Sequence, residues 1–174
     1  DLAVRIIGYC IELSLQPGSK EDTGSSLDER IAAAYSPMIR MLDSCDAAAK
    51  CSSDIIARGA CKYPDQLLPE LFGILAAHVS STTDQKVNVL NTLKTFVEQA
   101  HDTGGLMDQL IERVLDLVDS DSFVLREPAG RVLGVIKPRT IVPCLCKRIT
   151  DGKLHSVEAR SVAVSALANV FEYH

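Results

Sequence analysis

The chain has 174 residues, 47% of them hydrophobic, which is enough apolar material for a continuous core. Its 18 basic and 23 acidic side chains give a formal net charge of −5, and this argues against a nucleic-acid surface, because phosphate binding needs a basic excess. No apolar run approaches the roughly 20 residues of a membrane helix, so we expect no membrane partner.

Apolar residues recur at spacings of three and four along nearly the whole chain, and the alternation typical of strands is almost absent. The sequence therefore predicts an all-α protein. We expect about nine helices, in chain order at residues 2–15, 27–43, 46–62, 65–80, 83–100, 105–119, 122–136, 139–150 and 154–173. Because the separators between them are short, successive helices should fold back antiparallel.

One separator differs from the others in length and composition. Residues 16–26, "QPGSKEDTGSS", contain two glycines and no hydrophobic side chain, so we expect a flexible loop there. The remaining chain predicts a single helical-repeat domain over residues 1–174. Since residue 1 is Asp rather than Met, and the helical pattern is under way by Ala3, we expect this domain to be a fragment of a longer protein.

The second helix of each predicted pair follows a common pattern. Each begins near a basic residue, and these residues lie 36, 40 and 34 positions apart: Lys50, Lys86, Arg126 and Arg160. Positions three and seven beyond each basic residue share one helix face, and they are Ser53 and Ala57, Val89 and Leu93, Ala129 and Leu133, and Ala163 and Leu167. A helix pair that recurs at this period must stack on its neighbours to close a core. We expect this core to contain Leu93, Leu117, Leu133 and Leu167.

The stretches "DSFVLREPAGRVLG" (121–134) and "HSVEARSVAVSAL" (155–167) each have a polar turn, an apolar residue with an arginine, and then small and large core positions. This pattern resembles the HEAT/armadillo class of helical repeats over residues 27–173. The resemblance implies an α-solenoid of stacked antiparallel helix pairs. It also implies that the second helices line a concave surface, on which asparagines hold the backbone amides of a protein partner.

Arg126 and its equivalents are interpreted as residues of a turn or helix start that bond an aspartate of the adjacent repeat. Pro128 allows two interpretations. If the helix begins near Arg126, Pro128 lies in the first turn, where a missing N–H costs little. If the helix begins at Ser122, Pro128 lies further inside and bends the helix. We expect the first arrangement.

No residue pattern in the chain indicates catalysis, a metal or a cofactor. The six cysteines have no fixed spacing, and Cys144 and Cys146 point to different sides of a helix, so we expect reduced thiols in an intracellular protein, in the cytoplasm or alternatively the nucleus. None of the four histidines is paired with another ligand. Asp108, Glu112 and Asp116 could form an acid–base pair, but opposite apolar residues favour a solvated face. We predict that the protein is not an enzyme.

Charge is distributed unevenly. Residues 102–121 carry six acids and one base, and residues 126–153 carry seven bases and two acids. Two explanations stay open. The opposite charges of the two segments compensate each other between adjacent repeats, or the basic segment binds an acidic partner. In the second case the binding residues are Arg131, Lys137, Arg139 and Lys147.

The second helices also carry a polar ridge opposite their core face. In residues 83–100 it comprises Asn88, Asn91, Thr95 and Gln99, and in residues 154–173 it comprises Glu158, Ser161, Ser165 and Asn169. Asn88, Asn91 and Thr95 are candidate partner-binding residues, with an ordinary solvated helix face as the alternative.

These observations predict a non-catalytic protein–protein interaction scaffold whose partner presents an acidic or extended peptide segment. Within this interpretation, the chain also has a looser resemblance to the TOG modules, which bind tubulin through turns at one edge. The alternative from a different class is a helical-repeat nucleic-acid binder or enzyme, such as the DNA glycosylases built on similar repeats. The net charge argues against it.

Overall fold

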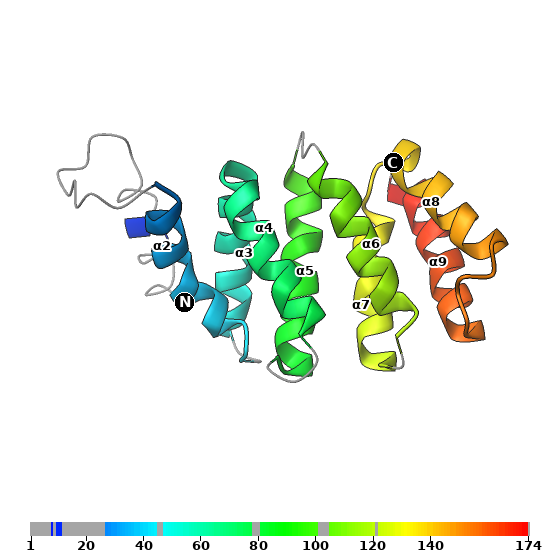
Figure 1. Cartoon of the computed structure of the whole chain (residues 1–174), viewed down its shortest axis with the longest axis horizontal. Coiled ribbons are helices and arrows are strands. Elements are labelled where there is room, and N and C mark those ends of the chain that lie inside the picture. The colour runs from blue at the N-terminus through cyan, green and yellow to red at the C-terminus, as the bar shows by residue number, and fades with distance from the viewer. Residues whose placement is uncertain are drawn as a thin grey trace. The chain divides into compact units, whose positions relative to one another are not determined.

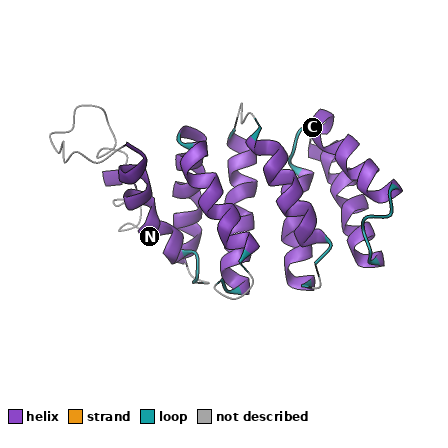
Figure 2. Cartoon of the chain, in the orientation of Figure 1, coloured by secondary structure: helices purple, strands orange, loops and turns teal. Residues whose placement is uncertain are grey.

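The structure is a computed structural model that describes residues 8, 10, 11, 27–44, 47–77, 81–100, 105–120 and 122–173. In these residues all regular structure is helical and no strand occurs, which confirms the all-α prediction (Figures 1 and 2). Eight helices lie in the described part of the chain: α2 (Leu27–Met41), α3 (Ala47–Lys62), α4 (Pro64–Ala76), α5 (Thr83–Gln99), α6 (Leu106–Val118), α7 (Phe123–Gly134), α8 (Pro138–Thr150) and α9 (Val157–Tyr173).

The predicted first helix is described only at residues 8, 10 and 11, which are helical. The predicted loop at residues 16–26 lies outside the described residues. The chain divides into two compact units, Asp1–Thr92 and Leu93–His174, with the division inside α5. A single repeat domain over residues 1–174 therefore stays a prediction.

In the first unit α3 packs against both α2 and α4. The buried face of α2 consists of residues at helical spacing, and these are Ile31, Tyr35, Met38 and Leu42. The ring of Tyr35 presses on α3 at Gly59, where an added Cβ would lie 2.5 Å from two ring carbons. Only glycine allows the two helices to approach this closely.

Polar contacts inside the same unit fix the start of α5. The side-chain amide of Asn88 donates to the backbone oxygens of Leu42 and Ser44, each at 2.8 Å, and so satisfies carbonyls at the C-terminal end of α2. Further along α5, the buried hydroxyls of Thr92 and Ser53 hydrogen-bond each other at 2.6 Å. Thr92 also donates to the backbone oxygen of Asn88 at 2.8 Å, so this polar pair is satisfied without water.

In the second unit α7 packs against α6 and, most extensively, against α9. Two glycines make the contact with α9 possible. A Cβ on Gly130 would lie 2.7 Å from Cγ1 of Val162, and a Cβ on Gly134 would lie 2.9 Å from Cβ of Asn169. The facing side of α9 is built from small residues, since its buried positions are Ala159, Ala163, Ala166 and Val170.

Two leucines of the predicted core are confirmed and two are not. Leu93 and Leu133 are fully buried. Leu117 and Leu167 are only half-buried, because each lies at the edge of its helix's apolar stripe. The centre of that stripe in α6 is instead formed by Leu110, Ile111, Val114, Leu115 and Val118.

The expectation for Pro128 was wrong. Helix α7 begins at Phe123, with Ser122 in an extended conformation (φ −80°, ψ 95°) before it, so the proline lies inside the helix and its ring is buried. The carbonyl of Val124, four residues earlier, therefore has no helical N–H donor. Val124 is exposed and lies near the start of the helix, so water can reach this carbonyl.

The expected bond between Arg126 and an aspartate is also corrected. Nε of Arg126 donates to the backbone oxygen of Ser120 at 3.0 Å, and Arg160 donates to that of Leu154 at 3.0 Å. Each arginine thus bonds the carbonyl six residues before it and closes the turn into its own helix. The contact between turns is made by Asp119, whose carboxylate accepts the backbone N–H of His155 at 2.8 Å.

Candidate functional site

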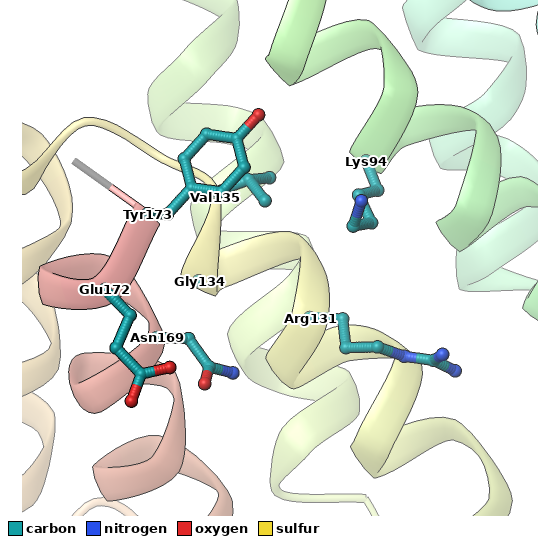
Figure 3. Close-up of a pocket in the computed structure, with 7 residues that line it drawn as sticks. All are labelled: Lys94, Arg131, Gly134, Val135, Asn169, Glu172 and Tyr173. Carbon is teal, nitrogen blue, oxygen red and sulfur yellow. The ribbon is translucent and has the colours of Figure 1, made fainter.

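A cleft of about 280 Å³ opens in the second unit, among residues of α5, α7 and α9. Figure 3 shows the residues around it, which come from α5, from α7 and the residue that follows it, and from α9. The lining residues are Lys94, Arg131, Gly134, Val135, Asn169, Glu172 and Tyr173.

Helices α7 and α9, which approach each other closely, form most of the lining of the cleft. Gly134 has no side chain to fill the space beside Asn169, so the backbone of α7 forms part of the wall. Arg131 is the exposed residue between the buried Gly130 and Val132, and its side chain must therefore point outward. The positions of the lining residues on α7 and α9 thus follow from the packing of these two helices.

The charges of the cleft are partly compensated. Nζ of Lys94 lies 2.5 Å from the carboxylate of Glu98, one helical turn further along α5. The exposed Arg131 has no ion pair or side-chain hydrogen bond to any residue that the structure describes. The residues that line the cleft therefore include the guanidinium of Arg131, the amide of Asn169, the phenol of Tyr173 and the carboxylate of Glu172, with the Arg131 side chain directed away from the other three (Figure 3). This combination can bind a carboxylate together with peptide backbone groups.

Of the predicted partner-binding residues, Arg131 is the one that lines the cleft. Asn88 is half-buried and its amide is bonded to the turn after α2. Asn91 is exposed and Thr95 half-buried, and both interact with other residues of the chain. Asn169, from the predicted polar ridge of the last helix, joins Arg131 at the cleft.

The sequence allowed two explanations for the basic segment at residues 126–153, compensation of the neighbouring acidic segment or binding of an acidic partner. Different residues of the segment fit each explanation. Nη2 of Arg148 lies 2.5 Å from the carboxylate of Glu112 and 3.7 Å from that of Asp116, so this arginine compensates the acidic helix α6. Arg139 and Lys147 are exposed on α8 and have no acidic partner in the described ranges of the chain. Lys137 is exposed and interacts with another residue. Arg139 and Lys147 therefore stay available to an acidic partner.

Sequence reasoning missed the cleft residues Lys94, Glu172 and Tyr173. One signal was present in the sequence. Gly130 and Gly134 lie four residues apart on one face of a predicted helix, a spacing that permits close approach of another helix. The identity of the approaching helix follows only from the tertiary structure.

The acidic residues, cysteines and histidines named in the sequence analysis are partly described. Asp108, Glu112 and Asp116 are exposed on α6, in agreement with the solvated face expected there. The described cysteines Cys10, Cys51, Cys61, Cys144 and Cys146 form no disulfide bond, and burial raises the pKa of the Cys61 thiol, which disfavours its reactive thiolate. No three described His, Cys, Asp or Glu side chains form a group that could hold a metal ion. Cys45, His78, His101 and His174 lie outside the described residues.

None of the helices in the described residues has the length and apolar character required to cross a membrane. Comparison with known proteins finds no family model, no curated protein and no solved structure that matches the chain. The geometry of the cleft and of the exposed cations is therefore the basis for a functional proposal.

Proposed function

We propose that this chain is a non-catalytic protein–protein interaction scaffold, a HEAT/armadillo-type solenoid segment that binds an extended or acidic peptide segment of another protein in the cytoplasm. The observation that carries this proposal is the cleft lined by Arg131 and Asn169, in which Arg131 has no acidic partner among the described residues.

Repetition within the chain supports the solenoid part of the proposal. Arg126 and Arg160 make the same bond to a carbonyl six residues earlier, at the start of α7 and of α9. The turn contact of Asp119 with His155 has a counterpart in the first unit, where Thr82 donates to the carboxylate of Asp43. Recurrent helix pairs with recurrent turn bonds are typical of stacked helical repeats.

The chemistry of the cleft indicates what its partner presents. A guanidinium binds a carboxylate with two parallel hydrogen bonds, and an asparagine amide both donates to and accepts from a peptide backbone. Arg131 and Asn169 together therefore suit an extended segment with an acidic side chain. Arg139 and Lys147 on α8 add positive charge that accelerates association with an acidic partner.

Charge reversal tests the proposal. The double variant Arg131→Glu, Arg139→Glu should capture less partner from a lysate and associate more slowly, with weaker salt dependence. Its thermal stability should stay close to that of the parent, because exposed charges contribute only about 0–1 kcal/mol each.

The matched control is Arg148→Glu, which reverses a cation that is already paired with Glu112. This variant should lower stability and leave capture unchanged once unfolded protein is subtracted. The proposal fails if Arg131→Glu, Arg139→Glu loses stability to the same extent as the control and retains full capture.

A second candidate function is favoured by one observation. Phe123 and Val157 begin α7 and α9, lie 34 positions apart like Arg126 and Arg160, and are 78% and 67% exposed. Exposed apolar side chains at matched turns fit the TOG-like alternative, in which turns at one edge bind tubulin. Co-sedimentation with microtubules and gel filtration with free tubulin test it. Binding that is lost in Phe123→Ser, Val157→Ser and kept in Arg131→Glu would favour the turns over the cleft.

A further inference from the structure

The α9 side of the cleft, formed by Asn169, Glu172 and Tyr173, differs in charge from the side that holds Arg131. These three residues are three and four positions apart, so they share one face of α9, and all are exposed. In Figure 3, Asn169 and Glu172 lie on one side of Gly134, and Arg131 lies on the other and points away from them. The carboxylate of Glu172 has no ion pair or hydrogen bond to any residue in the described ranges. An uncompensated negative charge therefore lies on this side of the cleft.

The end of helix α7 adds negative potential to the α9 side of the cleft. Helix α7 ends at Gly134, which also lines the cleft. The side-chain nitrogen of Asn169 lies 3.5 Å from the position that a Cβ on Gly134 would occupy, so the face of α9 that carries Asn169 lies against this helix end. The C-terminal end of a helix is the negative pole of its dipole and stabilises a nearby cation.

The cations of the cleft itself leave this negative charge available. Lys94 is paired with Glu98 on its own helix, and Arg131 is directed away from Glu172 (Figure 3). The ring of Tyr173, which is 54% exposed, presents an aromatic surface that attracts positive charge. The α9 side of the cleft therefore combines a carboxylate, an aromatic ring and a helix C-terminus, all of which favour a cationic ligand group.

We propose that the α9 side of the cleft binds a basic side chain of the partner, so that the bound segment carries a basic residue close to its acidic one. This inference rests on the proposed function, in which Arg131 binds the acidic residue. A segment with acidic residues alone would place like charge against Glu172, which weakens binding.

The distance between the helices sets the spacing of the two charges on the partner. The axes of packed helices lie about 8–10 Å apart, and an extended segment rises about 3.3 Å per residue. The acidic and basic residues of the partner should therefore lie about two to four positions apart.

The probe is a phage-displayed library of random peptides of about 12 residues, long enough to cross the cleft in extended form, selected on the full chain. Peptides enriched on the parent should combine an acidic and a basic residue at the expected spacing. Selection on Glu172→Gln should lose the preference for the basic residue and keep that for the acidic one. Selection on Arg131→Gln should show the reverse.

Fluorescence anisotropy of one selected peptide, labelled with fluorescein, gives the magnitude. Glu172→Gln should weaken its binding about two- to fivefold, as loss of one exposed ion pair does, and Glu172→Lys should weaken it further. A peptide with glutamate in place of its basic residue should bind Glu172→Lys more tightly than it binds the parent. The matched control is Glu158→Gln, which changes an exposed glutamate in the first turn of α9, outside the cleft, and should bind like the parent.

The inference is overturned if Glu172→Gln selects the same peptides as the parent, or if Glu172→Lys binds the selected peptide as tightly as the parent does. Peptides that depend on Arg131 and carry acidic residues without a basic one would overturn the inference alone and leave the proposed function standing. If no enriched peptide depends on Arg131 or on Glu172, the proposed function fails together with the inference.

Discussion

Helices α7 and α9 have the same sequence register but different surroundings. α7 is buried on most of its circumference, down to a proline and two glycines, and among its apolar residues only Phe123 and Val124 at its start are exposed. α9 buries a stripe of small residues and exposes Val164 and Phe171. Since an arginine in the first turn of each helix bonds a carbonyl of the preceding turn, the difference arises from neighbouring helices and not from local structure. A shared sequence pattern predicts that both segments form helices, but the helices that surround each one decide which of its residues are buried.

The largest expected effect distinguishes matched leucines of the two helices. Leu133→Ala should lower the free energy of unfolding by about 2–5 kcal/mol, because the leucine is fully buried and its truncation leaves a cavity. Leu167→Ala, at the equivalent position of α9, should cost clearly less, since Leu167 is half-buried. Urea denaturation of both variants provides the comparison. Equal losses would mean that α9 is covered as α7 is.

A smaller effect concerns the contact between the two helices. Gly134→Ala should lower the free energy of unfolding by about 1–3 kcal/mol, because the new methyl group overlaps Cβ of Asn169, which cannot rotate away. The matched control is Gly73→Ala in α4, where nothing lies within 4 Å of the added Cβ. This variant should gain up to about 1 kcal/mol from helix propensity. A neutral or stabilising Gly134→Ala would contradict the close approach of α7 and α9.

The elements that depend on local sequence were predictable. The spacing of apolar residues gave the all-helical class, and the positions three and seven beyond the basic residues placed Leu93 and Leu133 in the core. The predicted helix at residues 122–136 begins within one residue of α7, but the favoured interpretation of Pro128 was wrong, because it required a helix start near Arg126 whereas Ser122 precedes the first helical residue. A proline inside a helix leaves the carbonyl four residues earlier without its helical N–H donor, and whether that carbonyl finds another partner depends on the tertiary structure.

The candidate site was less predictable, because it depends on which helices meet. Arg131 and Asn169 are 38 residues apart in sequence, and their proximity to one cleft follows from the packing of α7 on α9. Likewise, the sequence could not show that Arg148 forms an ion pair with the acidic helix α6 while its neighbour Lys147 does not. These neighbours point to different sides of α8, and only the rotation of that helix directs Arg148 to Glu112.

Site-specific photocrosslinking tests the central claim, that the second-helix cleft binds a protein, most directly. A benzophenone amino acid replaces Asn169 in the cleft, or Gln109 on the exposed side of α6 as the control, and the full chain is irradiated in a lysate. The account predicts one dominant protein adduct at position 169 that disappears in the Arg131→Glu background, and no such adduct at position 109. Equal adduct patterns at the two positions, or an adduct at position 169 that persists in Arg131→Glu, would contradict it.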